Sequence, residues 1–221
     1  NGSTINANRV PPIEAVIFDC DGTLVDSEVI SLKVLVDLVA HHGLSIPPQQ
    51  AVEEWSGCDL HEVIEEIGRR LGKPLPANFI DTFREHQLAR LAVDVQPVAF
   101  AESLLTGMSL PYCVASNAPQ NKIRLCLQTT GLLPYVDPNL IFSAYDIQAW
   151  KPKPDLFLLA AERLGVAPKA CAVVEDSGVG IDAGLAAGMV VFGYDPHHRL
   201  PSRPGVIEVS CLDQLRPIFH R

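Results

Sequence analysis

The sequence predicts an α/β fold in which a Rossmann-like parallel sheet is interrupted by an inserted helical domain. Short apolar runs alternate with helical patterns over most of the 221 residues. Each main apolar run is followed by polar residues, as at the carboxyl end of a buried strand. The stretch 27–94 has no clear strand, and its apolar residues recur at helical spacing.

The strands of the sheet are expected at five places along the chain. They are residues 15–18, 112–115, 140–142, 172–174 and 189–192. Helices are expected over 121–130, 155–164 and 177–187, and Gly165 is placed to end the second of them. This alternation is typical of βαβ units and therefore of a parallel sheet.

The inserted block is expected to contain three helices, over 27–40, 59–71 and 78–92, with Ser27 as a cap for the first. Proline-rich stretches separate them. The predicted domains are therefore a core of residues 13–26 and 95–221 and a helical domain of residues 27–94. Residues 1–12 are expected to be a mobile tail or a remnant outside the fold.

Composition narrows the possible partners. The chain has 26 acidic and 17 basic side chains, a net charge of −9, which argues against a general nucleic-acid binder. No apolar run approaches the length of a membrane span, so no membrane partner is expected. The six cysteines are scattered without metal-binding spacing, which favours a reduced, cytoplasmic protein.

The first strand ends in a segment with two carboxylates, residues 19–23. Asp19 and Asp21 are two apart, so on an extended strand they point the same way, beyond its carboxyl end. That is where open α/β sheets bind ligands. Two such anions repel each other unless a cation lies between them or one is protonated. An ordinary polar turn is the alternative.

Three other strand ends or loops carry complementary groups. Ser116 and Asn117 offer a hydroxyl and backbone amides for an anion, or simply cap a helix. Lys151 stands in a proline-flanked loop, either as a phosphoryl ligand or as a solvated lysine. Glu175 and Asp176 suit a divalent cation; the alternative is that Asp176 or Ser177 caps a helix. Together these are the parts of a metal-assisted phosphoryl-transfer site.

With these four motifs in order, the sequence resembles the haloacid dehalogenase superfamily of phosphohydrolases. The resemblance implies that Asp19 attacks phosphorus and forms an aspartyl-phosphate, and that Asp21 is the general acid and base. It also implies a Mg²⁺ ion held by Asp19, the backbone carbonyl of Asp21 and Asp176, with Glu175 bound directly or through another ligand.

The same resemblance implies how the phosphate is bound. Ser116, the amide of Asn117 and Lys151 would bind the transferring oxygens. Gly22 and Thr23 would form the turn out of the first strand and would belong to the substrate site. Because Asp21 is present, the resemblance favours phosphate chemistry over dehalogenation.

The inserted block resembles the small helical cap of the group that contains β-phosphoglucomutase and many sugar-phosphate phosphatases. Two departures from the mutase pattern favour a hydrolase. Ser31 stands where the mutase has a histidine, and the loop 56–61 has no arginine for a second phosphate. Asp59 in that loop would repel a phosphate, and Asp59 and His61 are candidate substrate contacts.

The expected function is a Mg²⁺-dependent phosphatase acting on a small phosphorylated sugar or sugar acid, as a monomer or weak dimer. Segments around the phosphate site, including 19–30 and 145–152, are similar to those of a bacterial phosphatase of this group that acts on a phosphorylated sugar acid. The alternatives are a phosphosugar mutase and a non-catalytic phosphate-binding protein. Asn121 and Lys122 could help to position phosphate, but their expected role is helix surface. His197 and His198 are expected to be loop residues without a metal.

Overall fold

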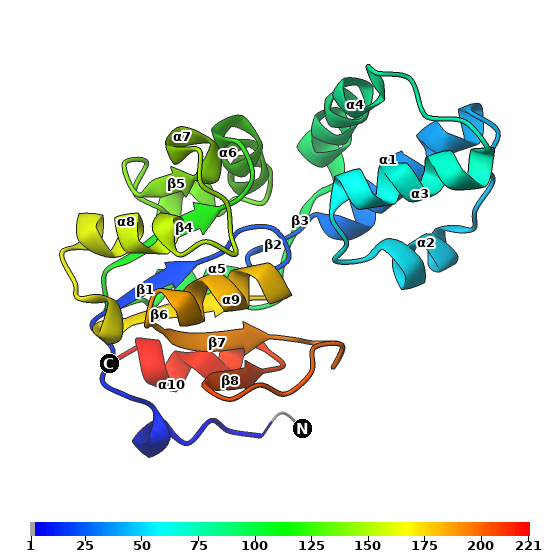
Figure 1. The fold of residues 1–221 in the computed structure, drawn as a ribbon. Coiled ribbons are helices and arrows are strands. Elements are labelled where there is room, and N and C mark those ends of the chain that lie inside the picture. Colours follow the sequence, from blue (N-terminus) through cyan, green and yellow to red (C-terminus); the bar gives the residue numbers. More distant parts are fainter. Residues whose placement is uncertain (1–2) are drawn as a thin grey trace. The chain divides into compact units, whose positions relative to one another are not determined.

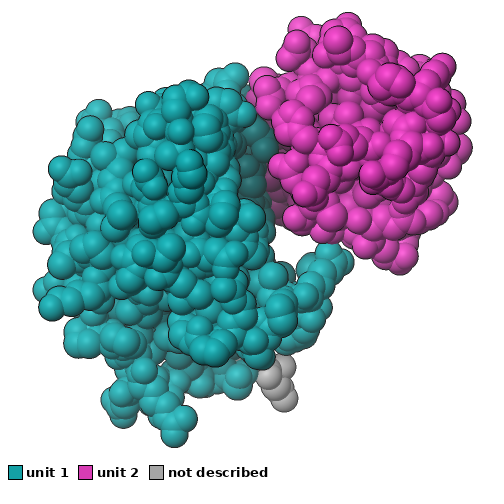
Figure 2. Space-filling view, viewed as in Figure 1, with its two compact units in different colours: residues 1–25, 97–221 teal, residues 26–96 magenta. Residues whose placement is uncertain are grey.

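The computed structural model describes residues 3–221, and its contacts divide the chain into two units. Unit 1 comprises residues 1–25 and 97–221, and unit 2 comprises residues 26–96, coloured separately in Figure 2. The unit boundaries fall in two short strands that pair with each other, β2 (Val25–Asp26) and β3 (Gln96–Pro97). The predicted helical domain, 27–94, lies just inside these boundaries.

Unit 1 is built on a six-stranded sheet in the order β5-β4-β1-β6-β7-β8, with all neighbours parallel (Figure 1). The strands are β1 (Ala15–Phe18), β4 (Tyr112–Ser116), β5 (Ile141–Ser143), β6 (Cys171–Glu175), β7 (Val190–Tyr194) and β8 (Val206–Val209). Every residue of β1 and β6 is buried, because helices cover both faces of the sheet. The predicted Rossmann-like parallel sheet is confirmed.

Side chains of β1 alternate between two cores. Ala15 and Ile17 join an apolar cluster with α8 (Asp155–Leu164) and α9 (Gly178–Ala186). On the opposite face Phe18 packs edge to face against Phe219 of α10 (Arg216–Phe219), with ring centroids 6.2 Å apart. The remaining helices of unit 1 are α5 (Ala101–Thr106), α6 (Gln120–Thr129) and α7 (Ala144–Ile147), with short 3₁₀ turns at Ala7–Arg9, Leu133–Tyr135, Pro168–Ala170 and Leu212–Leu215.

Unit 2 contains the helices α1 (Glu28–His41), α2 (Pro48–Trp55), α3 (Leu60–Leu71) and α4 (Phe79–Asp94). They enclose a separate apolar core that includes Leu35, Trp55 and Ile67. Helix α3 ends at Gly72, whose left-handed conformation (φ 72°) is the usual helix stop for a glycine. Ser27 stands at the N-cap of α1 but makes no capping hydrogen bond through its side chain.

Three sequence predictions need correction. Helix α2 was not expected because Pro47 and Pro48 suggested a break, yet Pro48 occupies the first turn, where proline is well tolerated. Strand β8 was also missed, since it is short, half exposed and at the sheet edge. Part of the expected tail has structure, because Asn6 caps the turn that follows it and Gln214 donates a hydrogen bond to the Ser3 carbonyl at 2.6 Å.

No helix within residues 3–221 combines the length and apolar character needed to cross a membrane.

Candidate active site

Three carboxylates meet at the carboxyl ends of the two central strands. Strand β1 pairs with β6 so that Phe18 lies opposite Val174, and the Asp19 N–H donates to the Val174 carbonyl at 3.0 Å. The next residues, Asp19 and Glu175, are therefore neighbours, and Asp176 follows. One carboxylate oxygen from each of the three lies within 4.8 Å of the others. This arrangement brings together the acidic residues that the first and fourth motifs predict.

The burial of these acids is electrostatically costly without a cation. Glu175 is fully buried, and burial together with the charge of Asp19 raises its pKa to about 7, although Lys151 opposes the shift. Burial, Asp19 and Glu175 likewise raise the pKa of Asp176, although a hydrogen bond from Thr23 opposes the shift. Hard divalent cations prefer carboxylate oxygens, so this donor set fits magnesium.

Lys151 lies inside the acidic cluster. Its ammonium donates to Asp19 Oδ1 at 3.0 Å, to Glu175 Oε1 at 2.5 Å and to the Ala115 carbonyl at 2.9 Å. Burial lowers its pKa, but the charges of Asp19 and Glu175 outweigh burial and raise the pKa overall, so the side chain remains a cation. With a side chain only 3% exposed, Lys151 is not the solvated loop lysine of the alternative interpretation.

Asn117 holds the backbone of Lys151 in place. Its Oδ1 accepts from the Lys151 N–H at 2.9 Å, and its Nδ2 donates to the Lys151 carbonyl at 3.3 Å. Ser116 is buried at the end of β4, where its Oγ accepts from the Ala118 N–H at 3.0 Å. Because Pro119 is the N-cap of α6, neither Ser116 nor Asn117 caps that helix. The Asn117 side chain is therefore fixed to the loop that supplies the lysine.

Gly22 and Thr23 adjoin Asp176. Gly22 has φ +79°, and a Cβ there would lie 2.0 Å from Asp176 Oδ2, so only glycine permits this approach. Thr23 is buried, and its hydroxyl donates to Asp176 Oδ1 at 3.1 Å. The two residues expected in the substrate site are thus positioned to hold a carboxylate of the acidic cluster.

Sequence reasoning missed the residues that hold Glu175. Ser177 caps α9 by accepting from the Gly180 N–H, and its hydroxyl donates to Glu175 Oε2 at 3.3 Å. A Cβ at Gly180 would lie 1.9 Å from the Glu175 carboxyl carbon. The helix-cap alternative is therefore right for Ser177, while Asp176 joins the cluster. The signal in the sequence was Gly180, a glycine in the first turn of the helix that follows Glu175 and Asp176.

Asp21 lies apart from the three-carboxylate cluster and has a different partner. Lys122 of α6 donates to Asp21 Oδ2 at 3.2 Å, and its side chain is 17% exposed. Burial lowers the pKa of Lys122, but the charge of Asp21 and this hydrogen bond raise it overall. The expectation that Lys122 is helix surface was wrong, because α6 turns this side chain toward the end of β1.

The candidate contacts in unit 2 have local roles. Asp59 is the N-cap of α3, since its Oδ1 accepts from the His61 N–H at 2.9 Å and the Glu62 N–H at 3.3 Å. His61 is exposed. The Ser31 hydroxyl donates to the Ser27 carbonyl at 3.0 Å and accepts from Gln87 at 2.8 Å.

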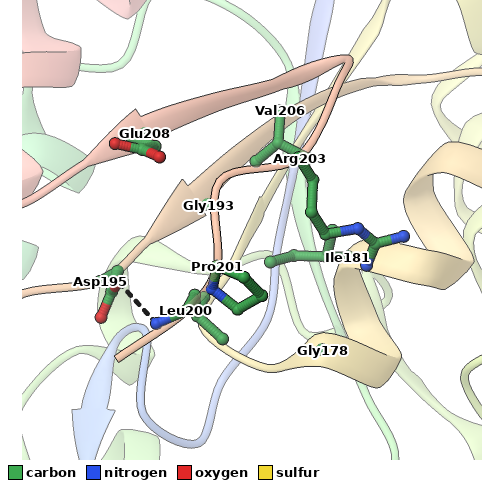
Figure 3. Close-up of a pocket in the computed structure, with 9 residues that line it drawn as sticks. All are labelled: Gly178, Ile181, Gly193, Asp195, Leu200, Pro201, Arg203, Val206 and Glu208. Atoms are coloured by element: carbon green, nitrogen blue, oxygen red, sulfur yellow. Dashed lines mark hydrogen bonds between the residues drawn. The ribbon is translucent and has the colours of Figure 1, made fainter. Parts of the chain in front are cut away.

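A small pocket of about 80 Å³ lies beside the start of α9 and strands β7 and β8 (Figure 3). Its nine lining residues include Ile181, Leu200 and Val206, and none of the predicted site residues. Arg203 in its wall is paired with Asp182 at 2.5 Å. The acidic cluster therefore remains the candidate site.

The arrangement of this site agrees with a known family. The family described as haloacid dehalogenase-like hydrolase matches residues 16–194, which include all four motifs. The chain is a haloacid dehalogenase-like hydrolase. The family expected from the ordered motifs is thereby confirmed, together with its α/β fold.

Relatives of this hydrolase include named phosphatases. The chain is 37% identical over 210 residues to the 6-phosphogluconate phosphatase of Escherichia coli (strain K12), covering 94% of this chain and 95% of the relative. It is 29% identical over 176 residues to fructose-1-phosphate phosphatase YqaB of the same strain, covering 79% and 92%. A solved structure of a hydrolase of this family from Deinococcus radiodurans R1, with bound phosphate and sodium, is 28% identical, has a TM-score of 0.76 and covers 94% and 95%.

Proposed function

We propose that this hydrolase is a Mg²⁺-dependent phosphatase that hydrolyses a small phosphorylated sugar or sugar acid, with 6-phosphogluconate as the first substrate to test. The observation that carries the proposal is the convergence of Asp19, Lys151 and the other two acids at the carboxyl ends of the two central strands. The substrate class is supported by the 37% identity to the 6-phosphogluconate phosphatase.

In the proposed reaction Asp19 is the nucleophile. One of its carboxylate oxygens forms a bond to phosphorus while the bond from phosphorus to the sugar oxygen breaks. Asp21 donates a proton to the departing oxygen and then accepts one from the water that attacks the aspartyl-phosphate. That attack breaks the bond between phosphorus and Asp19, releases inorganic phosphate and restores both carboxyl groups.

The surrounding residues orient Asp19. Lys151 donates directly to Asp19 Oδ1, and Asn117 fixes the lysine's backbone. The ion would be held by Asp19, Asp176 and the Asp21 carbonyl, with Glu175 as a direct or indirect ligand. When bound, Mg²⁺ offsets the negative charge of the carboxylates and the phosphoryl group. Ser116, the Asn117 amide and Lys151 are the proposed phosphate ligands.

We retain Asp59 and His61 as candidates for substrate choice. The Ser31 hydroxyl is engaged within unit 2 and offers no imidazole, which supports hydrolysis over the mutase alternative. The complete set of proposed reactive groups likewise disfavours a purely phosphate-binding protein. We also propose a reducing, cytoplasmic setting, supported by six free cysteines.

The test is phosphate release from a panel of sugar phosphates, with and without Mg²⁺. The panel contains 6-phosphogluconate, fructose 1-phosphate, and glucose 1- and 6-phosphates. Release is expected from at least one substrate, only with Mg²⁺, and Asp19→Asn should lower it by about a thousandfold or more. Asp81→Asn, an exposed acid of α4, is the matched control with unchanged turnover. Interconversion of the glucose phosphates without phosphate release would overturn the hydrolase.

A further inference from the structure

Lys122 forms an ion pair that the family motifs do not include. Its Nζ lies 3.2 Å from Oδ2 of Asp21, and the two side chains are 17% and 31% exposed. They come from different segments of unit 1, since Lys122 belongs to α6 and Asp21 to the turn after β1. The pair thus joins a helix to the segment that carries the proposed acid and base.

The position of Lys122 follows from the faces of α6. Residues four apart lie on the same side of a helix, and Cys126, four residues after Lys122, is fully buried. Ile123 and Leu127 of the same helix are also buried. The aliphatic stem of Lys122 therefore begins at the edge of the core-facing surface, and its ammonium extends to the polar strand end.

The side chain of Asp21 is more exposed than that of Asp19, 31% against 10%. Asp19 is bonded through its backbone to β6 and through its carboxylate to Lys151. Asp21 lies in a turn next to Gly22, and its carboxyl is nearly a third exposed. An ammonium at hydrogen-bond distance restricts rotation of that carboxyl and adds a charge-assisted contact. General acid catalysis requires the proton donor to lie within hydrogen-bond reach of the departing oxygen.

We propose that Lys122 is a positioning residue that holds the carboxyl of Asp21 in the orientation used for proton transfer. This inference rests on the proposed function, in which Asp21 is the general acid and base. Lys122 acts through Asp21, and the role differs from that of Lys151, which contacts the nucleophile. The competing role for Lys122 is direct binding of the phosphoryl group.

The test compares two substrates that differ in their need for an acid. A sugar phosphate releases an alkoxide, which must be protonated as it leaves, whereas p-nitrophenyl phosphate releases a stable phenolate. Because kcat/KM reports the steps through departure of the leaving group, loss of acid positioning should affect mainly the sugar phosphate. Lys122→Met should lower kcat/KM for the sugar phosphate by about ten- to a hundredfold and for p-nitrophenyl phosphate by less than about threefold.

Two variants control for charge and structure. Lys122→Arg retains a cation that can reach Asp21 and should recover much of the lost activity on the sugar phosphate. Arg124→Met removes the same charge from the same helix, where Arg124 contacts Gln120 and the Pro138 carbonyl instead of Asp21. It should leave the ratio of the two kcat/KM values unchanged.

Equal losses on both substrates in Lys122→Met would assign the lysine to phosphate binding or to structure and would overturn the proposal. Unchanged activity on both substrates would overturn it as well. Asp21→Asn, measured with the same pair of substrates, separates this failure from failure of the proposed function. If Asp21→Asn discriminates between the substrates and Lys122→Met does not, only the positioning role is wrong. If Asp21→Asn does not discriminate either, the acid role of Asp21 fails, and the positioning role fails with it.

Discussion

Two acids of the candidate site, Glu175 and Asp176, each lie against a glycine and accept a hydrogen bond from a small hydroxyl side chain. Asp176 lies against Gly22 and accepts from Thr23, while Glu175 lies against Gly180 and accepts from Ser177. These contacts matter for the proposed metal site, because carboxylates that bind a metal must be oriented by their surroundings. The two glycines have no side chain, and this leaves room for the carboxyl groups of Asp176 and Glu175.

Gly22→Ala should damage the acidic cluster as well as the turn. The substitution forces alanine into a left-handed conformation and places its Cβ 2.0 Å from Asp176 Oδ2. Gly131→Ala is the matched control, because Gly131 also has positive φ (+76°) but nothing within 4 Å of its Cβ. Both variants should lose about 1–2 kcal/mol of stability from backbone strain.

Only Gly22→Ala should also raise the Mg²⁺ concentration for half-maximal activity, by about tenfold or more. Chemical denaturation measures the stability of both variants, and a Mg²⁺ titration of phosphate release measures the second effect. Equal Mg²⁺ requirements in the two variants would contradict a role for the glycine in placing Asp176.

At the scale of elements, the sequence predicts the parts of the fold whose signal is local. Buried parallel strands are continuous apolar runs, so β1, β4 and β6 are readily found. Helix α2 was missed because it begins with a proline pair, and strand β8 because it is a half-exposed edge strand without a continuous apolar run. The contact of Lys122 with Asp21 joins residues 101 positions apart and depends on how α6 packs, which no local pattern reveals.

Two glycines near the start of helix α9 differ in their surroundings: a Cβ would clash at Gly180 but not at Gly178. Gly180→Ala places a Cβ 1.9 Å from the Glu175 carboxyl carbon, which must move and weaken its contact with Lys151. The free energy of unfolding should fall by about 1–3 kcal/mol. Turnover should fall by about ten- to a hundredfold.

Gly178→Ala on the same helix meets nothing within 4 Å and should change stability by less than about 0.5 kcal/mol. Thermal unfolding and phosphate release should therefore separate the two alanines. If Gly180→Ala kept the stability and turnover of Gly178→Ala, Glu175 would have moved without loss of either.

At the scale of the whole molecule, a net charge of −9 coexists with a site proposed for an anionic substrate. The contradiction is only apparent, because Lys151 and Lys122 place two cations among the acids at the strand ends. A bound divalent cation adds the largest local charge. The alternation of apolar runs and helical patterns correctly predicted the α/β fold. The net charge could not reveal that three acids are gathered, and partly compensated by lysines, at one point.

The buried acids make the stability of the protein depend on pH and on the metal. Glu175 has an ordinary pKa of 4.5, which the metal-free fold raises to about 7. Between these values the folded state binds more protons than the unfolded state, so this group makes stability fall as pH rises. For Glu175 alone the loss should be roughly 1–3 kcal/mol. In the proposed site Mg²⁺ would bind the ionised acids, so its stabilising effect should grow over the same interval.

Unfolding curves between about pH 5 and pH 8, with and without Mg²⁺, measure both trends. Glu175→Gln imitates the protonated carboxyl and should flatten the metal-free dependence on pH relative to the wild type. It should also reduce the stabilisation by Mg²⁺ at the upper end of the range. Glu85→Gln, an exposed acid of α4, should leave both trends intact. Parallel curves for Glu175→Gln and the wild type would mean that Glu175 is ionised in the metal-free fold, with Lys151 compensating its charge fully.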